Sequence, residues 1–124
     1  MHIVHLEDEG PLREIMQIAL TSADPKLTMT QFIDSDNAIE FISENLEDIT
    51  LFLLDVRVPG ALDGMEVAGR IRELGSERPI IITSAYRKPK KAQLETVNAQ
   101  WMAKPWHIID APTTLLPLAR GETK

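Results

Sequence analysis

Four short apolar segments of the chain are each followed by residues that could bind a metal ion or take part in group transfer. These residues are Glu7-Asp8-Glu9, Asp55, Thr83-Ser84 and Lys104-Pro105. Any one of them alone would pass for a solvated loop residue, but chance rarely supplies the whole ordered set. Asp55 is the most informative member, because a carboxylate beside the apolar run 51–54 is expensive to bury without a partner.

The acidic members of this set predict a site for a hard cation. Two carboxylates about 4 Å apart repel each other by roughly 4 kcal/mol at an effective dielectric constant near 20. A cluster of Glu7, Asp8 and Asp55 would therefore raise its pKa values or bind a cation. Mg²⁺ typically takes one or two carboxylates and keeps several waters, and those positions can receive a phosphoryl oxygen.

The segments that precede these residues have the pattern of strands in a parallel sheet. The runs 3–6, 51–54 and 79–83 are short, apolar and rich in Val, Ile and Leu, which is typical of strands buried on both faces. The segment 27–32 alternates apolar and polar residues, which predicts an edge strand with one wetter face. A further short run at 100–103 could complete the sheet.

Between the predicted strands, apolar residues recur with a helical period. The three clearest stripes are Leu12, Ile15, Met16, Ala19 and Leu20, then Ala38, Phe41, Ile42 and Leu46, then Val67, Ala68, Ile71 and Leu74. Asp34-Ser35-Asp36 offers capping groups for the second helix, and Gly75 ends the third. A weaker fourth helix is predicted at about 90–97, with Asn98 in position for a left-handed C-cap.

The last helix is harder to place, because Pro112 and Pro117 interrupt it. Proline is tolerated in a first helical turn but costs roughly 3 kcal/mol in a helix interior. A start near Thr113 or Thr114 would put Pro117 in the first turn and predicts a short helix of about 115–120. A longer, kinked helix that begins near Ile108 is the alternative.

The alternation of strand and helix, repeated five times, predicts a parallel sheet covered by helices on both faces. We find no linker, internal repeat or low-complexity segment in the 124 residues, so we expect residues 1–124 to form one domain. The final helix of that domain is expected to be short or kinked near residues 112–120.

Composition limits the function classes that need to be considered. The formal net charge of −6 disfavours direct binding of nucleic acid, which needs clustered Lys and Arg. The densest basic run, residues 87–91, is interpreted as a solvated helix start. No apolar run approaches the roughly 20 residues of a membrane helix. The absence of Cys excludes disulfides and thiolate sites and weakly favours a cytoplasmic location.

At the residues described above, the chain resembles the receiver domain of bacterial two-component response regulators. The motif residues are Glu7-Asp8, Asp55, Ser84-Ala85 and Lys104-Pro105. The segment 55–64 resembles the family's Asp-x-x-x-Pro-x-x-Asp-Gly loop with one extra residue. The resemblance runs from Ile3 to about Arg120. It implies an α/β, flavodoxin-like (βα)5 three-layer sandwich with a five-stranded parallel sheet in the order 2-1-3-4-5.

The resemblance also implies a role for each motif residue. Asp55 would be the nucleophile that accepts a phosphoryl group from a sensor histidine kinase or a phosphotransfer protein. Asp8 and Asp55 would bind Mg²⁺ directly, the main-chain carbonyl of Arg57 would be a third ligand, and Glu7 would act through a coordinated water.

Two further phosphoryl contacts follow from the same resemblance: Ser84 would hydrogen-bond one phosphoryl oxygen, and Lys104 would pair with another. This division of labour suits phosphoryl transfer, which requires positioning and neutralisation of charge more than covalent chemistry.

Three residues near the motif are assigned more specific roles by the resemblance. Trp101, three residues before Lys104, occupies the position of the family's switch aromatic and would report the state of Ser84, although a packing role is equally compatible. Arg57 and Tyr86 fall at positions where the family tunes dephosphorylation. Their bulk predicts a fairly long-lived phosphoryl group.

The expected function is therefore a signalling phosphoacceptor that is not itself an enzyme and that changes its affinity for an unspecified downstream effector. A homodimer is possible. The lengthened loop after Asp55, the weak fourth helix and the prolines near the C-terminus leave the output surface open.

Two alternatives remain. One is an interaction module with the same fold and no phosphorylation. The other is a phosphohydrolase with an Asp nucleophile, which would usually place a second Asp where Arg57 stands.

Overall fold

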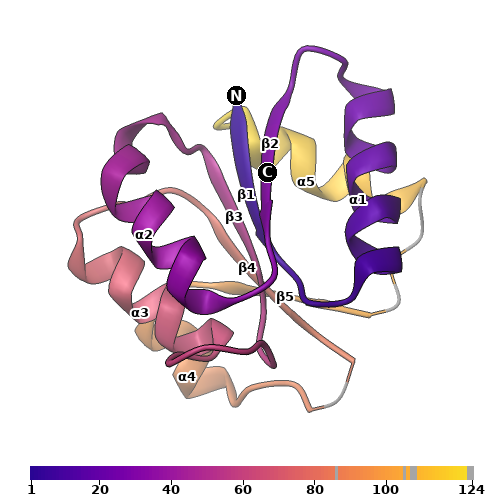
Figure 1. Cartoon of the computed structure of the whole chain (residues 1–124). Helices are drawn as coiled ribbons and strands as arrows, with labels where there is room; N and C mark the ends of the chain where they lie inside the picture. The colour runs from indigo at the N-terminus through magenta and orange to yellow at the C-terminus, as the bar shows by residue number, and fades with distance from the viewer. Residues whose placement is uncertain (86, 105, 107–108, 123–124) are drawn as a thin grey trace.

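A computed structural model describes residues 1–85, 87–104, 106 and 109–122. Its sheet has five parallel strands in the order β2-β1-β3-β4-β5 (Figure 1). The strands are β1 (His2–Leu6), β2 (Thr28–Phe32), β3 (Leu51–Asp55), β4 (Ile80–Ser84) and β5 (Gln100–Ala103). The helices are α1 (Gly10–Ala23), α2 (Ser35–Asn45), α3 (Gly64–Glu73), α4 (Lys91–Thr96) and α5 (Asp110–Ala119), with a short 3₁₀ helix at Leu46–Asp48. The predicted fold class and strand order are confirmed.

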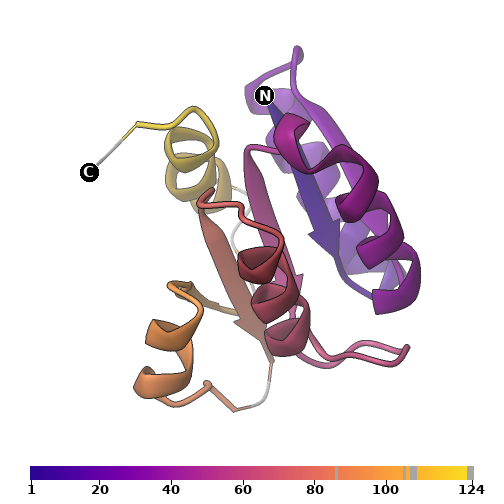
Figure 2. The same cartoon turned by 90° about the vertical axis from the view of Figure 1, so that its left-hand side faces the viewer.

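The helices form a layer on each face of the sheet. Helices α1 and α5 cover one face, and α2, α3 and α4 lie side by side over the other (Figures 1 and 2). Each strand sends alternate side chains to the two faces, so two separate cores form. In β1, Val4 and Leu6 join the core under α2, α3 and α4, whereas Ile3 joins the core under α1 and α5.

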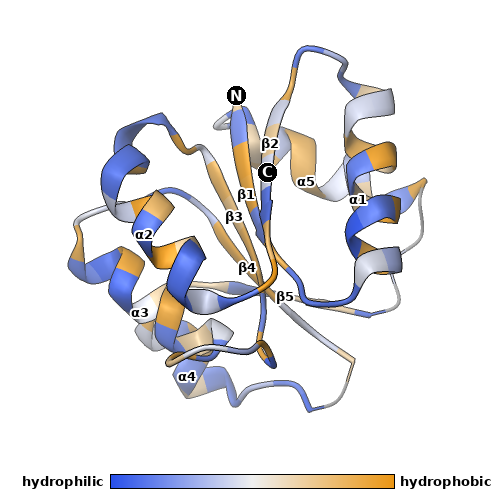
Figure 3. Cartoon of the chain, in the orientation of Figure 1, coloured by the Kyte–Doolittle hydropathy of each residue, from blue (hydrophilic) through white to orange (hydrophobic). Residues whose placement is uncertain are grey.

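The burial of each strand follows its sequence pattern. All residues of β3 and β4 are buried, as their continuous apolar runs predicted, and β2 at the edge has none that is fully buried. Figure 3 shows hydrophobic residues along the strands and on the inner sides of the helices, with hydrophilic residues facing outward. No helix in the described part of the chain is long and apolar enough to span a bilayer.

The ends of the helices are fixed by local side-chain and backbone chemistry. Asp34 caps α2 by accepting a hydrogen bond from the Asn37 amide at 2.8 Å. Asp63 and Glu66 form a capping box at the start of α3. Asn98 adopts a φ of 51°, so the predicted left-handed residue after α4 is confirmed. Gly75, predicted to end the third helix, follows the C-cap of α3 with a φ of 102°.

The preferred prediction for the last helix was wrong. Helix α5 begins at Asp110 rather than near residue 115, so Pro112 lies in its first turn and Pro117 lies inside the helix. The interior proline is tolerated because α5 buries Ala111, Leu115, Leu116 and Ala119 against the sheet. This apolar burial outweighs the loss of one backbone hydrogen bond.

Candidate functional site

The register of the sheet brings the predicted functional residues to one edge. Leu6 of β1 lies opposite Leu54 of β3, which places Glu7 beside Asp55. Asp55 in turn lies opposite Thr83 of β4. These are the carboxyl ends of parallel strands, where ligands of open α/β sheets generally bind.

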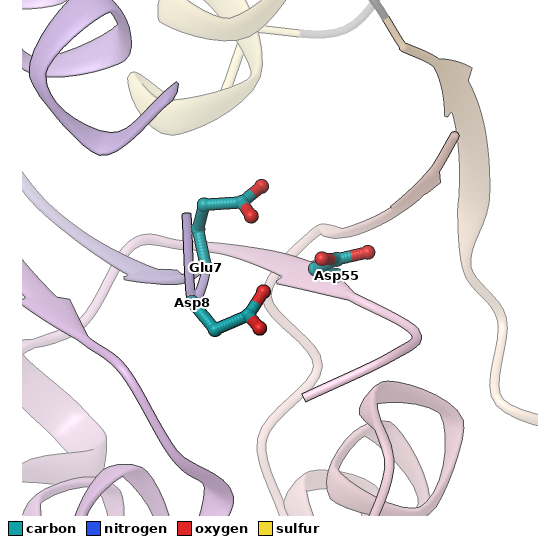
Figure 4. Close-up of side chains that lie close together, drawn as sticks. All are labelled: Glu7, Asp8 and Asp55. Carbon is teal, nitrogen blue, oxygen red and sulfur yellow. The ribbon is translucent and has the colours of Figure 1, made fainter. Parts of the chain in front are cut away.

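Three carboxylates meet at this edge. Oxygen atoms of Glu7, Asp8 and Asp55 all lie within 4.8 Å of one another. Figure 4 shows Glu7 and Asp8 extending from the end of β1 and Asp55 from the end of β3 into the same space. Glu7 and Asp55 are buried, whereas Asp8 is exposed. The three side chains that the sequence singled out are therefore brought together.

Lys104 joins this cluster from the end of β5. Its ammonium lies 2.6 Å from Glu7 Oε1 and 3.0 Å from Asp55 Oδ2, and its side chain is only 3% exposed. Its backbone N–H donates to the Ser84 carbonyl at 3.4 Å, which links the ends of β5 and β4. Lys104 thus bridges the two buried carboxylates.

The electrostatics of the cluster leave an excess of negative charge. Burial raises the pKa values of Asp55 and Glu7, and the hydrogen bonds from Lys104 oppose this effect only in part. Burial also disfavours the charged form of Lys104, but Glu7 and Asp55 outweigh it and raise the pKa of the ammonium. Lys104 contacts two of the three carboxylates, so one ammonium stands against three negative groups, and the donor set fits a hard divalent cation with oxygen ligands.

A pocket of about 330 Å³ opens beside the cluster. It is lined by Asp8, Glu9, Asp55, Arg57, Ala85 and Lys104. Arg57, whose carbonyl is a predicted ligand, therefore stands at the pocket wall. Ser84 is buried at the end of β4, next to the lining residue Ala85.

The other predicted site residues are placed differently. Trp101 is partly buried on β5 and packs against the core under α2, α3 and α4. Tyr86 and Pro105 lie outside the described residues.

Local backbone packing holds Asp55 at the pocket. The Gly64 amide donates to the Val56 carbonyl at 2.9 Å, and the Val56 amide donates to the Thr83 carbonyl at 3.0 Å. A Cβ atom on Gly64 would overlap the main-chain carbonyl of Asp55. The start of α3 therefore approaches the end of β3 so closely that only glycine fits there.

Sequence reasoning missed the surroundings of Lys104. The ammonium lies 5.6 Å from the ring centre of Trp106, which in turn makes an edge-on contact with His5 at 5.8 Å. His5 is fully buried, and its Nδ1 lies 3.0 Å from the Gln31 amide nitrogen. Burial, with the nearby positive charges, lowers the pKa of His5 to about 3, so the ring is neutral. The only sequence signal was the position of Trp106 just after Lys104-Pro105.

Comparison with known proteins agrees with this geometry. A family model described as "Response regulator receiver domain" matches residues 3–110. The chain therefore belongs to the response regulator receiver family.

Two curated relatives are longer than the chain. The transcriptional regulatory protein DltR of Streptococcus agalactiae is 36% identical over 85 residues, which cover 68% of this chain and 36% of that protein. The cyclic di-GMP phosphodiesterase response regulator RpfG of Xanthomonas campestris pv. campestris is 32% identical over 109 residues, which cover 85% of this chain and 28% of that protein. The chain thus spans about a third of the length of these relatives.

Solved structures share the fold at lower identity. The chemotaxis protein CheY4 of Vibrio cholerae matches with a TM-score of 0.80 at 20% identity, covering 94% of this chain and 97% of the other. A CheY-like receiver domain protein of Methanospirillum hungatei matches with a TM-score of 0.82 at 16% identity, covering 97% and 94%.

Proposed function

We propose that this chain is a phosphoacceptor of two-component signalling, in which Asp55 receives a phosphoryl group from a histidine kinase or a phosphotransfer protein. The observation that carries the proposal is the convergence of Glu7, Asp8, Asp55 and Lys104 at one pocket. Membership of the receiver family supports it.

In the proposed reaction, a carboxylate oxygen of Asp55 attacks the phosphorus atom. A bond forms between phosphorus and that oxygen, while the bond between phosphorus and the donor's imidazole nitrogen breaks. Asp55 is suited to this role because it stands at the end of a buried strand and lines the pocket. The hydrogen-bonded backbone around Val56 and Gly64 would hold the nucleophile in place, and such positioning lowers the barrier to reaction.

Asp8, Asp55 and the carbonyl of Arg57 would hold Mg²⁺, with Glu7 acting through a coordinated water. Bound there, the ion would neutralise charge on the phosphoryl oxygens. The excess negative charge of the described cluster and the exposure of Asp8 to the pocket support this assignment.

Lys104 would supply the second positive charge. Its ammonium contacts Asp55 at 3.0 Å, so it is already within reach of a group attached to that carboxylate. The Ser84 hydroxyl would donate to another phosphoryl oxygen, with Trp101 as the side chain that follows the rearrangement. A doubly charged phosphoryl group in this pocket would bias the domain between two conformations and so change partner binding. The downstream partner is left unspecified, and the location is proposed to be cytoplasmic.

The test is to incubate the chain with Mg²⁺ and a small phosphodonor and to measure its intact mass. We expect an adduct of one phosphoryl group that requires Mg²⁺ and is lost in Asp55→Asn. Glu44→Gln, at an exposed carboxyl on α2, is the matched control and should retain the adduct. Absence of any adduct with phosphodonors and with beryllofluoride would refute the proposal and favour an interaction module. Steady phosphate release from many esters would instead indicate a hydrolase.

A further inference from the structure

The loop between β3 and α3, residues 56–63, carries one residue more than the receiver pattern and lines the pocket through Arg57. Its two ends are closed by the hydrogen bond from the Gly64 amide to the Val56 carbonyl. The middle of the loop, residues 59–62, lies away from this closure, beside the beginning of α2 (Figure 1). Contacts made by residues 59–62 therefore determine how well the backbone at Arg57, which lines the pocket, is fixed in position.

The first turn of α2 holds the loop through three hydrogen bonds. The Ser35 amide donates to the Pro59 carbonyl at 2.9 Å, and the Leu62 amide donates to the Ser35 hydroxyl at 3.1 Å. The Ala61 amide donates to a carboxylate oxygen of Asp36 at 3.4 Å. Ser35 is fully buried under the loop. Ser35 thus binds the loop on both sides of its turn.

Gly60 shows how close this contact is. It has a φ of +114°, a conformation that side chains rarely adopt, and a Cβ atom added there would overlap the Ser35 hydroxyl. The loop therefore turns directly over Ser35. A larger residue at position 60 would have to move the loop away from α2.

The hydroxyl of Ser35 is not needed to begin the helix. Asp34 is the N-cap, and its carboxylate already accepts hydrogen bonds from the amide and the side chain of Asn37 at 2.8 and 2.9 Å. An ordinary capping role for Ser35 would also leave its hydroxyl bonded within α2, whereas it bonds to Leu62. The contact therefore serves the loop.

We propose that Ser35 is a positioning residue for the metal and phosphoacceptor site. By fixing residues 59–62 against α2, it holds the backbone at Arg57 in place, so that the carbonyl there is preorganised as a ligand. This inference rests on the proposed function, because it concerns the same Mg²⁺ site. It also gives the lengthened loop a defined contact on another element, because residues 59–62 bind Ser35 of α2.

The test compares the wild type, Ser35→Ala and Ser43→Ala. Ser43 lies on the same helix, is exposed and donates to the Ile39 carbonyl within α2 at 2.7 Å, so it controls for loss of a hydroxyl. Amide hydrogen exchange by NMR reports the loop without metal, and a Mg²⁺ titration reports the site. In Ser35→Ala we expect faster exchange at Leu62 and about fivefold weaker Mg²⁺ binding, the loss that one modest hydrogen bond implies. Ser43→Ala should change neither.

Gly60→Ala approaches the same contact from an exposed position and serves if Ser35→Ala does not fold. It should also accelerate exchange at Leu62 and weaken Mg²⁺ binding. Unchanged Mg²⁺ affinity in both variants, with faster exchange at Leu62, would overturn the positioning role. Failure of the proposed function is read separately from the wild type, which would then bind no Mg²⁺ and form no adduct.

Discussion

Replacing Asp55 by Asn should stabilise the protein when no divalent cation is present. The substitution keeps the size of the side chain and an oxygen that can accept the Lys104 hydrogen bond, so it removes charge with little change in packing. The wild-type cluster places Asp55 within 4.8 Å of the other two carboxylates and 3.0 Å from the Lys104 ammonium. The effect therefore depends on whether repulsion or attraction is larger.

Coulomb's law at an effective dielectric constant of about 20 gives roughly 3.5 kcal/mol of repulsion for each carboxylate pair at 4.8 Å and roughly 5.5 kcal/mol of attraction to Lys104 at 3.0 Å. The two repulsions exceed the attraction by about 1 to 2 kcal/mol. Burial, which raises the pKa of Asp55, adds to the cost of keeping this carboxylate charged. Asp55→Asn should raise the free energy of unfolding by about this amount.

Urea unfolding with and without Mg²⁺ is the assay. In chelator we expect Asp55→Asn to be more stable than the wild type. At a Mg²⁺ concentration of about 100 times the dissociation constant, the wild type should gain about 2.7 kcal/mol and the order should reverse. Glu44→Gln controls for net charge and should behave as the wild type.

A less stable Asp55→Asn protein in chelator would refute this reasoning, because it would mean that the contact with Lys104 outweighs the repulsion. A Mg²⁺ response of equal size in the two proteins would refute the assignment of Asp55 as a ligand.

Three further predictions concern the same edge of the sheet. Without Mg²⁺, the free energy of unfolding should fall as pH rises above the ordinary Asp range, because the folded protein still holds protons on Glu7 and Asp55, whose pKa values are raised. Urea titrations at several pH values should show a smaller fall in Asp55→Asn. Lys104→Met should lower the free energy of unfolding in chelator by about 3 kcal/mol, and Mg²⁺ should partly restore it. An equal loss in the control Lys26→Met, at an exposed position, would count against the role of the buried ammonium. Gly64→Ala should destabilise the protein by about 2 kcal/mol or more, because the new Cβ would overlap the Asp55 carbonyl. Gly69→Ala, in open space on the same helix, should stabilise it by about 1 kcal/mol. Thermal melts that show a loss in both variants would instead indicate that α3 does not tolerate Ala in general.

Local patterns were sufficient to predict most of the fold. Continuous apolar runs identified β1, β3 and β4, and alternation identified the edge strand β2, because burial on two faces or one leaves different periodicities. The start of α5 was misplaced because the cost of an interior Pro117 was weighed without the packing of α5 on the sheet. That packing depends on residues far apart in the sequence.

The site, too, has residues that the sequence pattern predicts and contacts that it does not. Glu7, Asp8, Asp55 and Lys104 could be predicted because each lies at the end of a strand or within two residues of it, and parallel strands bring such positions to one edge. The contact of Lys104 with Trp106 and the hold of Ser35 on the loop could not be predicted. Ser35 and the loop belong to segments that no periodicity or spacing connects. Trp106 is close to Lys104 in the sequence, but no pattern indicates that its ring lies beside the ammonium.

The attachment of Lys104 to the end of β5 has a consequence for synthesis of the chain. A ribosome makes the three carboxylates within the first 55 residues, but the ammonium that bridges Glu7 and Asp55 emerges only about 50 residues later. Until then, β1 and β3 can pair only by bringing like charges together. Lys104, at the end of the last strand to be made, therefore supplies the positive charge that the carboxylates at the ends of β1 and β3 lack. Before it is made, a cation from solution would have to take its place.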